Sequence, residues 1–328
     1  MKKDIHILIG GKMEPFDKED TKFQLRIRDL IDIPEEILKQ DIVIFHCPYD
    51  LKFLDRLNKP SILYNHLGGR QNTFMFDTIL REGTSDRYKK IILRKDHDWV
   101  LKKHNELFKK ADVILSNSNF IRSMTLKYIG VDSFVCYPPV DIKKFKLPKN
   151  IPIRNYFLSV QRYHWQKRID IQIEAFRGIK ENLILIYNSK NGIPYELKRM
   201  TEDMNNIQIL ERVNDKELLK LYQNAKATIQ TGYLEDFGLI PVESMACGTP
   251  NIVVDEAGFK ETVNRTELGI RIKEPYVQNL RKAILNIKEY NSKILKKEAE
   301  KYSMERFKKE MKQYIKLAVE RHDKKNQF

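Results

Sequence analysis

Two glutamates in one short stretch carry the side chains best suited to hold a hydroxylated ligand. Glu235 and Glu243 are separated by seven residues, and Gly238 lies between them. The run Lys226–Gln230 before them is typical of a buried strand, and a helix is predicted to begin at Pro241. Carboxylates accept hydrogen bonds from hydroxyls, and the free N–H groups of a helix start attract anions. The stretch therefore predicts a site for a sugar or ribose whose charged part is held nearby.

The backbone between the two glutamates is predicted to approach that ligand closely. Gly238 stands between Phe237 and Leu239 and has no side chain to keep the ligand away. Each glutamate alone has a plainer interpretation, because a carboxylate in the first turn stabilises a helix and a loop carboxylate is usually solvated. Their shared surroundings favour a binding site.

Basic and imidazole side chains follow other predicted strands. Arg162 and Lys167 come after the strand candidate Tyr156–Val160, on one loop that leads into a helix. Together they can neutralise a diphosphate that leaves as an anion, although either alone would be an ordinary surface base. His66 directly follows the strand candidate Ser61–Asn65, at the end of the strand where ligands of parallel sheets gather. The alternative for His66 is a structural imidazole bonded to a loop carbonyl.

The segment 235–243 resembles the E-x7-E signature of retaining, nucleotide-sugar-dependent glycosyltransferases of family 4. The resemblance implies the α/β fold called GT-B, with two Rossmann-like, doubly wound domains and a cleft between them, and it implies no metal or other cofactor. It also implies that Glu235 contacts the hydroxyls of the donor sugar and that Glu243 contacts the nucleotide ribose. Asp236 departs from the usual small residue, and Gly232 stands where a serine is common.

Further segments match the same family, and the resemblance gives each a role. Arg162 and Lys167 match the Gly-Arg…Lys loop that holds the donor diphosphate, with glutamine in place of its glycine. His66 closes a Pro-x-x-x-x-x-His segment whose histidine faces the donor sugar. The resemblance also implies that Arg212 and Val213 hold the nucleotide base, mostly by their backbone, and that Gly10 and Gly11 face the donor diphosphate. For both segments a plain turn is the alternative.

Composition narrows the class of protein. The 328 residues are enough for two domains, and the net charge of +15 favours anionic partners: nucleotide diphosphates, lipid-linked phosphates, an anionic membrane surface or nucleic acid. The three cysteines are scattered without C-x-x-C spacing, which fits a reducing compartment and argues against a zinc site or disulfide framework. No run approaches the roughly 20 apolar residues of a membrane span. We expect a cytoplasmic protein that is at most peripheral to a membrane.

The stretch 86–110 is predicted to form a long basic amphipathic helix. Such a helix can lie on anionic lipid, or it can pack its apolar stripe on the sheet and solvate its charges. Asp96, His97 and Asp98 imitate a D-x-D metal motif, but they fall within helical periodicity, whereas that motif belongs at a strand end or in a loop. No metal site is predicted.

Strand and helix signals alternate along the whole chain, which is the pattern of parallel α/β sheets. The alternation restarts at Tyr156–Val160, after a stretch rich in proline and basic residues. We expect an acceptor-side domain of residues 1–148, to which the resemblance adds a C-terminal helix over 303–328. A nucleotide-sugar-binding domain is expected over 149–302.

The reading that follows is a retaining, metal-independent glycosyltransferase that moves a hexose to a saccharide or lipid-linked saccharide. The segment 138–141, Pro-Pro-Val-Asp, is similar to mannosyltransferases of the family, which favours GDP-mannose as the donor and places UDP-hexoses second. Two alternatives remain. One is a basic nucleic-acid-binding protein, for which no module is recognisable, and the other is a relative that binds nucleotide sugar without transferring it.

Overall fold

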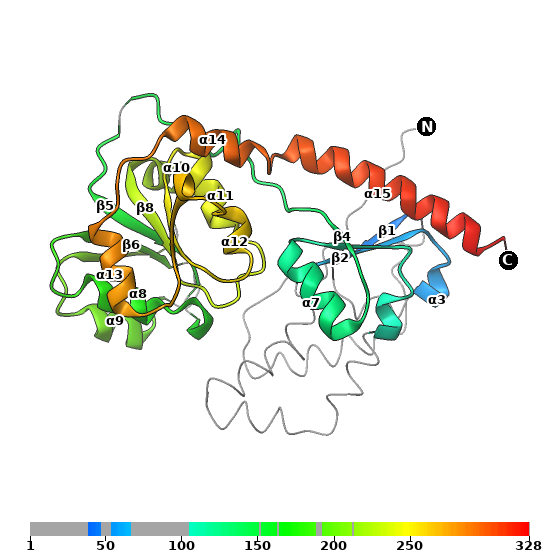
Figure 1. The fold of residues 1–328 in the computed structure, drawn as a ribbon, viewed down its shortest axis with the longest axis horizontal. Coiled ribbons are helices and arrows are strands. Elements are labelled where there is room, and N and C mark those ends of the chain that lie inside the picture. Colours follow the sequence, from blue (N-terminus) through cyan, green and yellow to red (C-terminus); the bar gives the residue numbers. More distant parts are fainter. Residues whose placement is uncertain are drawn as a thin grey trace, which may run out of the picture. The chain divides into compact units, whose positions relative to one another are not determined.

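The computed structural model describes residues 39–46, 54–66, 105–150, 152–162, 164–187, 192–211 and 213–327. The chain divides into two compact units, and Figure 1 draws their elements along the sequence. One unit is made of residues 1–136 and 308–328, and the other of residues 137–307. Gly10, Gly11, Arg212 and residues 86–104 of the predicted helix, with its Asp-His-Asp segment, lie outside the described residues; of the rest of that prediction, residues 105–108 are helical.

The unit of residues 137–307 is built on a six-stranded sheet in which every pairing is parallel. Its strands lie in the order β10-β9-β8-β5-β6-β7. In chain order they are β5 (Tyr156–Val160), β6 (Asn182–Tyr187), β7 (Ile207–Glu211), β8 (Ala225–Gln230), β9 (Asn251–Val254) and β10 (Gly269–Ile272). The chain runs outward from β5 to β7 and then returns to β8 on the other side of β5. This is the doubly wound order of nucleotide-binding sheets, and its switch point lies between β5 and β8.

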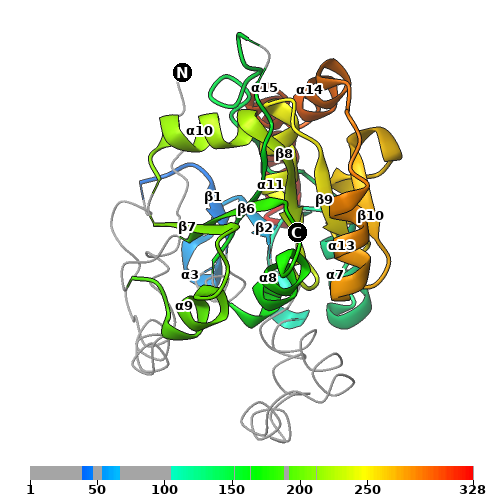
Figure 2. The same cartoon turned by 90° about the vertical axis from the view of Figure 1, so that its left-hand side faces the viewer.

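Helices cover both faces of this sheet, as Figure 2 shows. One layer holds α8 (Ile169–Phe176), α9 (Tyr195–Thr201) and α13 (Val277–Leu285). The other holds α10 (Asp215–Asn224), α11 (Leu239–Ala246) and α14 (Ser292–Glu300). Short helices complete the unit: η3 (Trp165–Lys167), α12 (Phe259–Thr262) and η4 (Thr266–Leu268). With helices on both faces the strands must be apolar on both, and all four residues of β9 are buried.

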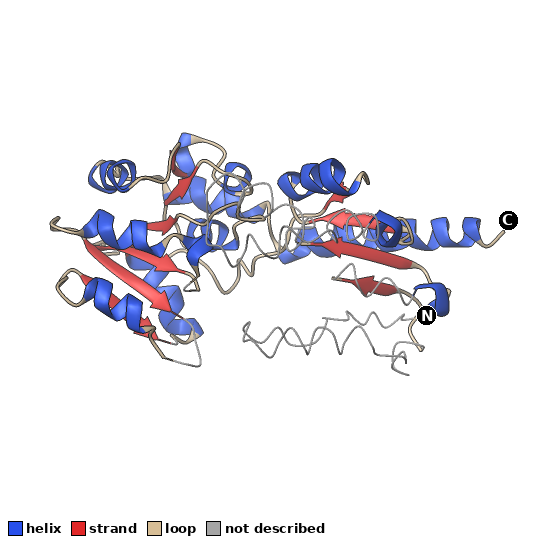
Figure 3. Cartoon of the chain, turned by 90° about the horizontal axis from the view of Figure 1, so that it is seen from below, coloured by secondary structure: helices blue, strands red, loops and turns tan. Residues whose placement is uncertain are grey.

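The unit of residues 1–136 and 308–328 has a smaller described sheet, again parallel throughout (Figure 3). Its strands follow one another across the sheet in chain order: β1 (Val43–Phe45), β2 (Ser61–Asn65), β3 (Val113–Ser116) and β4 (Phe134–Val135). Its described helices are α3 (Leu54–Leu57), α7 (Asn119–Ile129) and, from Lys308 onward, α15 (Met304–Lys325), and residues 105–108 are also helical. Each unit has its own apolar core of buried strand and helix side chains.

Buried Asp112 anchors the end of α15 to this smaller sheet. Lys325 Nζ lies 2.7 Å from Asp112 Oδ1, and Arg321 donates to the Asp112 carbonyl at 3.0 Å. The other carboxylate oxygen accepts from the backbone N–H and the hydroxyl of Ser61, both at 2.9 Å. The C-terminal helix is therefore held by a carboxylate whose own position is set by β2.

The segment that follows β4 belongs to the larger unit, although the sequence placed residues up to 148 in the first domain. Val140 donates its N–H to the Tyr302 carbonyl at 2.8 Å, and Phe145 packs edge-on against Tyr222 with ring centroids 5.6 Å apart. Because these contacts lie within residues 137–307, the segment folds as part of that unit.

Candidate functional site

The loops that follow β5 and β8 meet at the switch point of the larger sheet. Lys167 ends the first loop and Glu235 lies in the second, and Lys167 Nζ is 2.6 Å from Glu235 Oε2. The two side chains are 26% and 22% exposed, so the ion pair is reachable from solvent. Parallel neighbouring strands present their carboxyl ends on one edge, which is why residues 68 positions apart in the chain meet here.

A hydrogen-bonded frame behind this ion pair joins the two loops. Tyr233 N donates to the Gln166 carbonyl at 2.6 Å. Thr231 Oγ1 donates to the Lys167 carbonyl at 2.7 Å and accepts from Gln172 Nε2, also at 2.7 Å. Arg168 adds a salt bridge of 3.1 Å to Glu256. None of these supporting side chains was predicted from the sequence, because ordinary polar residues near loops form no recognisable pattern.

Gly238 gives the second loop its shape. Its φ of 89° lies in the left-handed region, and a β-carbon there would come 2.9 Å from the Phe259 ring. Helix α11 begins at Leu239, not at Pro241 as predicted, because Gly238 serves as its N-cap. Since glycine has no side chain, no side-chain cap satisfies the first N–H groups of the helix. Phe237 is buried below this turn, whereas Leu239 is 42% exposed. The turn thus presents a glycine backbone and the start of a helix beside Glu235, as an approaching anion would need.

Glu243 lies on α11 in a more enclosed setting than Glu235. It is the one residue of the stretch 241–250 that keeps partial exposure. Tyr222, on α10, donates its hydroxyl proton to Glu243 Oε2 at 2.7 Å. Burial raises the pKa of the Glu243 carboxyl to about 7, while the Tyr222 hydrogen bond and the positive charge of Lys144 oppose that rise. Tyr222 was not predicted as a site residue, and the sequence signal that could have indicated it is the apolar face of its amphipathic helix.

The other predicted donor residues have separate surroundings. Arg162 is exposed on the loop that follows β5. Val213 follows the end of β7 and is partly buried against the core, so its side chain serves packing and only its backbone is suited to a ligand. The structure thus brings Lys167, Glu235 and the Gly238 turn together, and the roles assigned to Arg162 and Val213 stay predictions.

His66 belongs to the smaller unit, at the end of β2. Its Nε2 lies 2.7 Å from His46 Nδ1 at the end of β1, and the two rings stack with centroids 5.0 Å apart. Burial, and then the nearby His46, lower the pKa of His66 to about 4. His66 is therefore a neutral imidazole at physiological pH, and one of the pair donates to the other. The sequence indicated the strand end but not the second histidine.

Neither a metal cluster nor a membrane span is found in the described ranges. No three His, Cys, Asp or Glu side chains of those ranges are grouped so that they could hold a metal ion. Within the same ranges, no helix is both long and apolar enough to cross a bilayer.

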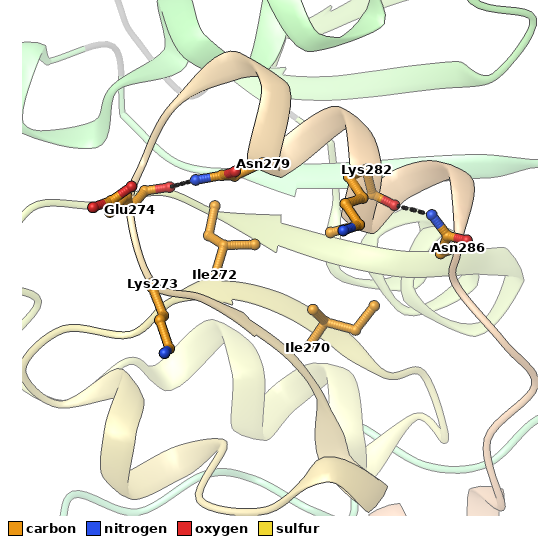
Figure 4. Close-up of a pocket in the computed structure, with 8 residues that line it drawn as sticks. Ile270, Ile272, Lys273, Glu274, Asn279, Lys282 and Asn286 are labelled. Carbon is orange, nitrogen blue, oxygen red and sulfur yellow. Dashed lines mark hydrogen bonds between the residues drawn. The ribbon is translucent and has the colours of Figure 1, made fainter.

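A groove of about 510 Å³ lies along the sheet edge, between β10 and α13 (Figure 4). Ile270 and Ile272 form its apolar floor, but the two asparagines beside it are engaged with backbone carbonyls. Asn279 donates to Glu274 at 3.1 Å, and Asn286 donates to Lys282 at 2.7 Å. Because β10 is two strands away from β8, this groove is separate from the ion-paired loops.

Comparison with known proteins gives the chain a family context. The family described as "Glycosyl transferases group 1" matches residues 141–309, just over half of the chain. The alpha-1,3/1,6-mannosyltransferase ALG2 of Kluyveromyces lactis is 29% identical over 201 residues, which cover 47% of this chain and 40% of that protein. The GDP-Man:Man(3)GlcNAc(2)-PP-Dol alpha-1,2-mannosyltransferase of Dictyostelium discoideum is 26% identical over 172 residues, covering 45% and 34%. The chain thus matches less than half of the length of these relatives.

The fold has a counterpart among solved structures. Sucrose-phosphate synthase from Thermosynechococcus elongatus superimposes with a TM-score of 0.75 at 16% identity, over 93% of this chain and 81% of that one. The structural neighbours are GT-B glycosyltransferases, so the predicted α/β fold class is confirmed. At this identity the likeness speaks for the fold alone.

Proposed function

The chain belongs to the glycosyl transferases group 1 family, and on that premise we propose that it transfers a hexose from a nucleotide sugar to a saccharide acceptor. The observation that carries the proposal is the meeting of Lys167 with Glu235 beside the Gly238 turn, at the switch point of a nucleotide-binding sheet. Cation, carboxylate and open helix start are the groups that a sugar diphosphate needs.

Each charged group has a proposed role in donor binding. Glu235 accepts hydrogen bonds from the hydroxyls of the donor sugar, while the backbone of Phe237, Gly238 and Leu239 orients it. Glu243 accepts from the ribose hydroxyls. Lys167 exchanges part of its ion pair with Glu235 for the donor diphosphate, which can reach both side chains because they are partly exposed.

The proposed reaction retains the configuration of the sugar. The acceptor oxygen bonds to the anomeric carbon on the face from which the diphosphate leaves, as the bond from that carbon to the phosphate oxygen breaks. The proton of the acceptor hydroxyl passes to the departing phosphate. Arg162 and Lys167 stabilise the charge that develops on the diphosphate, a task that side-chain cations can perform without a metal ion. His66, neutral at physiological pH, is proposed to face the donor sugar.

GDP-mannose is the proposed donor, with UDP-hexoses second. Two observations support this order: the Pro-Pro-Val-Asp segment at 138–141, and mannosyltransferase in the names of both relatives described above. The name of the second relative also includes GDP-Man and a PP-Dol-linked saccharide, which supports a lipid-linked acceptor. The net charge of +15 suits such a phosphate and an anionic membrane surface at the cytoplasmic face, to which the protein would bind peripherally.

Calorimetry against a panel of nucleotide sugars tests the proposal, with and without EDTA. We expect GDP-mannose to bind, the binding to survive EDTA, and a polyprenyl-diphosphate saccharide to receive mannose from the bound donor. Donor binding without transfer to any such acceptor would identify a non-catalytic relative. Tight, salt-sensitive binding to RNA or DNA with no binding to nucleotide sugars would overturn the assignment.

A further inference from the structure

Tyr222 has a feature that packing alone does not require. Its side chain is fully buried, and its hydroxyl donates to Glu243 Oε2 at 2.7 Å. Two contacts hold it in place: the Phe145 ring packs edge-on against it at 5.6 Å, and Thr249 Oγ1 donates to the Tyr222 carbonyl at 2.6 Å. The phenol is thus a rigid donor aimed at one carboxylate oxygen.

We propose that Tyr222 is a positioning residue for donor binding, whose hydroxyl fixes the orientation of the Glu243 carboxyl group, favours its ionised form and leaves its remaining lone pairs for the ribose hydroxyls. The inference rests on the proposed function, because it assumes that Glu243 meets the donor. A carboxylate offers about four lone-pair directions, and the phenol uses one. Among residues 241–250 Glu243 alone is partly exposed, so a ligand can reach the rest.

A partly buried tyrosine in the same unit, Tyr156, shows the ordinary way to satisfy the hydrogen bond of a phenol. Tyr156 on β5 donates its hydroxyl to the Leu221 carbonyl at 3.0 Å. That contact meets the hydrogen-bonding need of the hydroxyl without involving a charge. Tyr222 instead donates its hydrogen bond to the ionisable carboxyl group of Glu243, which is close in sequence to the ion-paired loop. This hydrogen bond orients the carboxyl group and favours its charged form.

The charged and titratable groups around Glu243 come from three elements. On α10, Tyr222 favours the carboxylate and Asp215 disfavours it; from the segment 141–148, Lys144 favours it. At the C-cap of α11, burial raises the pKa of the Cys247 thiol to about 12, so Cys247 stays neutral. Because burial brings the pKa of Glu243 to about 7, the carboxyl group lies near half-ionisation at neutral pH, where one hydrogen bond changes its charge appreciably.

The pH dependence of nucleotide-sugar binding tests the proposal. The diphosphate of GDP-mannose or UDP-glucose is esterified at both ends and does not titrate between about pH 5 and 9, so a midpoint in that range belongs to the protein. Wild-type binding should weaken on acidification through the pKa of Glu243, and Glu243→Gln should remove that dependence. Tyr222→Phe should move the midpoint upward, because it removes a bond that favours the carboxylate, and should weaken binding about tenfold at pH 7.

Two variants separate positioning from packing. Tyr156→Phe removes a hydroxyl of the same unit that does not touch Glu243, and should leave the midpoint unchanged. Asp215→Asn removes a negative charge near Glu243 and should move the midpoint downward, opposite to Tyr222→Phe. A loss of packing would weaken binding at every pH. It would not shift the midpoint in opposite directions in Tyr222→Phe and Asp215→Asn.

Carboxyl-carbon NMR of glutamate-labelled protein provides a second readout that needs no donor. The resonance missing in Glu243→Gln identifies the group, and its midpoint should rise in Tyr222→Phe. If the wild type binds GDP-mannose or UDP-glucose and Tyr222→Phe binds with the same midpoint and affinity, the positioning role is wrong. If the wild type binds no nucleotide sugar, the proposed function fails and the role falls with it, whatever the NMR midpoint shows.

Discussion

The two glutamates of the E-x7-E stretch carry the same side chain in opposite environments. Glu235 lies in a loop, pairs with Lys167 at 2.6 Å and is partly open to solvent. Glu243 lies in a helix, accepts from a fully buried phenol and has its pKa raised to about 7 by burial. One is a carboxylate held by a cation, and the other is a carboxyl group near the point of titration. The same side chain therefore forms two different kinds of hydrogen-bond acceptor, because its surroundings differ at the two positions.

The largest expected effect is on the rate of transfer, when the cation that pairs with Glu235 is removed. Lys167→Met should slow transfer about 10²–10³-fold, because it removes a cation from the developing charge of the diphosphate. Steady-state kinetics would place most of this loss in kcat and less in KM.

A matched ion pair controls for folding in that experiment. Lys226 Nζ lies 2.6 Å from Glu181 Oε2, with side chains 30% and 25% exposed, at the start of β8 and away from the switch-point loops. Lys226→Met should change kcat less than twofold. Equal losses in the two variants would show that the Lys167 pair serves stability only.

Donor affinity gives the next effect, on the Glu243 side. Glu243→Gln should weaken nucleotide-sugar binding about 10-fold at pH 8, because a neutral amide accepts more weakly from ribose hydroxyls and offers fewer lone pairs. Calorimetry with GDP-mannose measures it. The same affinity for wild type and variant at pH 8 would remove Glu243 from the donor site.

Replacing Gly238, which lies between the two glutamates, should lower the free energy of unfolding. Gly238→Ala forces a β-carbon to 2.9 Å from the Phe259 ring at a positive φ, which should cost about 1–3 kcal/mol. Gly192 has a similar φ of 76° with open space around it, so Gly192→Ala isolates the backbone strain. Urea unfolding of both variants compares them, and equal losses would mean that Phe259 moves aside.

The smallest effect concerns stability against pH. The pKa of Glu243 in the folded chain, about 7, exceeds its ordinary value, so the folded state holds an extra proton between about pH 4.5 and 7. Stability from this group is present below that window and is lost as the pH rises through it. Glu243→Gln should therefore melt a few degrees higher than wild type at pH 8 but not at pH 4.5. The opposite order would contradict the raised pKa.

His66 provides the reverse sign in the other unit. Its pKa of about 4 in the folded chain lies below the ordinary 6.5, so the unfolded chain binds more protons in that window and stability falls as the pH drops through it. The two groups thus have opposite effects on stability in acid, so the contribution of Glu243 is measured by comparing wild type and variant at the same pH.

The sequence alone determined the fold class and the local pattern of the candidate site. Alternating strand and helix signals predicted parallel sheets, and strand ends predicted where Lys167, Glu235 and His66 would lie, because residue type and periodicity are local properties. The glycine at 238 was predicted to allow a close approach of the ligand, which stays a prediction; the structure shows that Gly238 adopts a positive φ and lies against Phe259. The start of α11 was misplaced by two residues, since a proline fits several positions of a first turn.

Only the tertiary structure decided the partners. The return of the chain from β7 to β8 brings the two loops together, and the packing of α10 on α11 places Tyr222 against Glu243. His46 and His66 meet because the parallel neighbours β1 and β2 end at the same edge of the sheet. The charge state of a carboxyl or imidazole depends on burial and on neighbours distant in sequence. The chain therefore specifies which groups are present, and the fold sets what each can bind and at which pH.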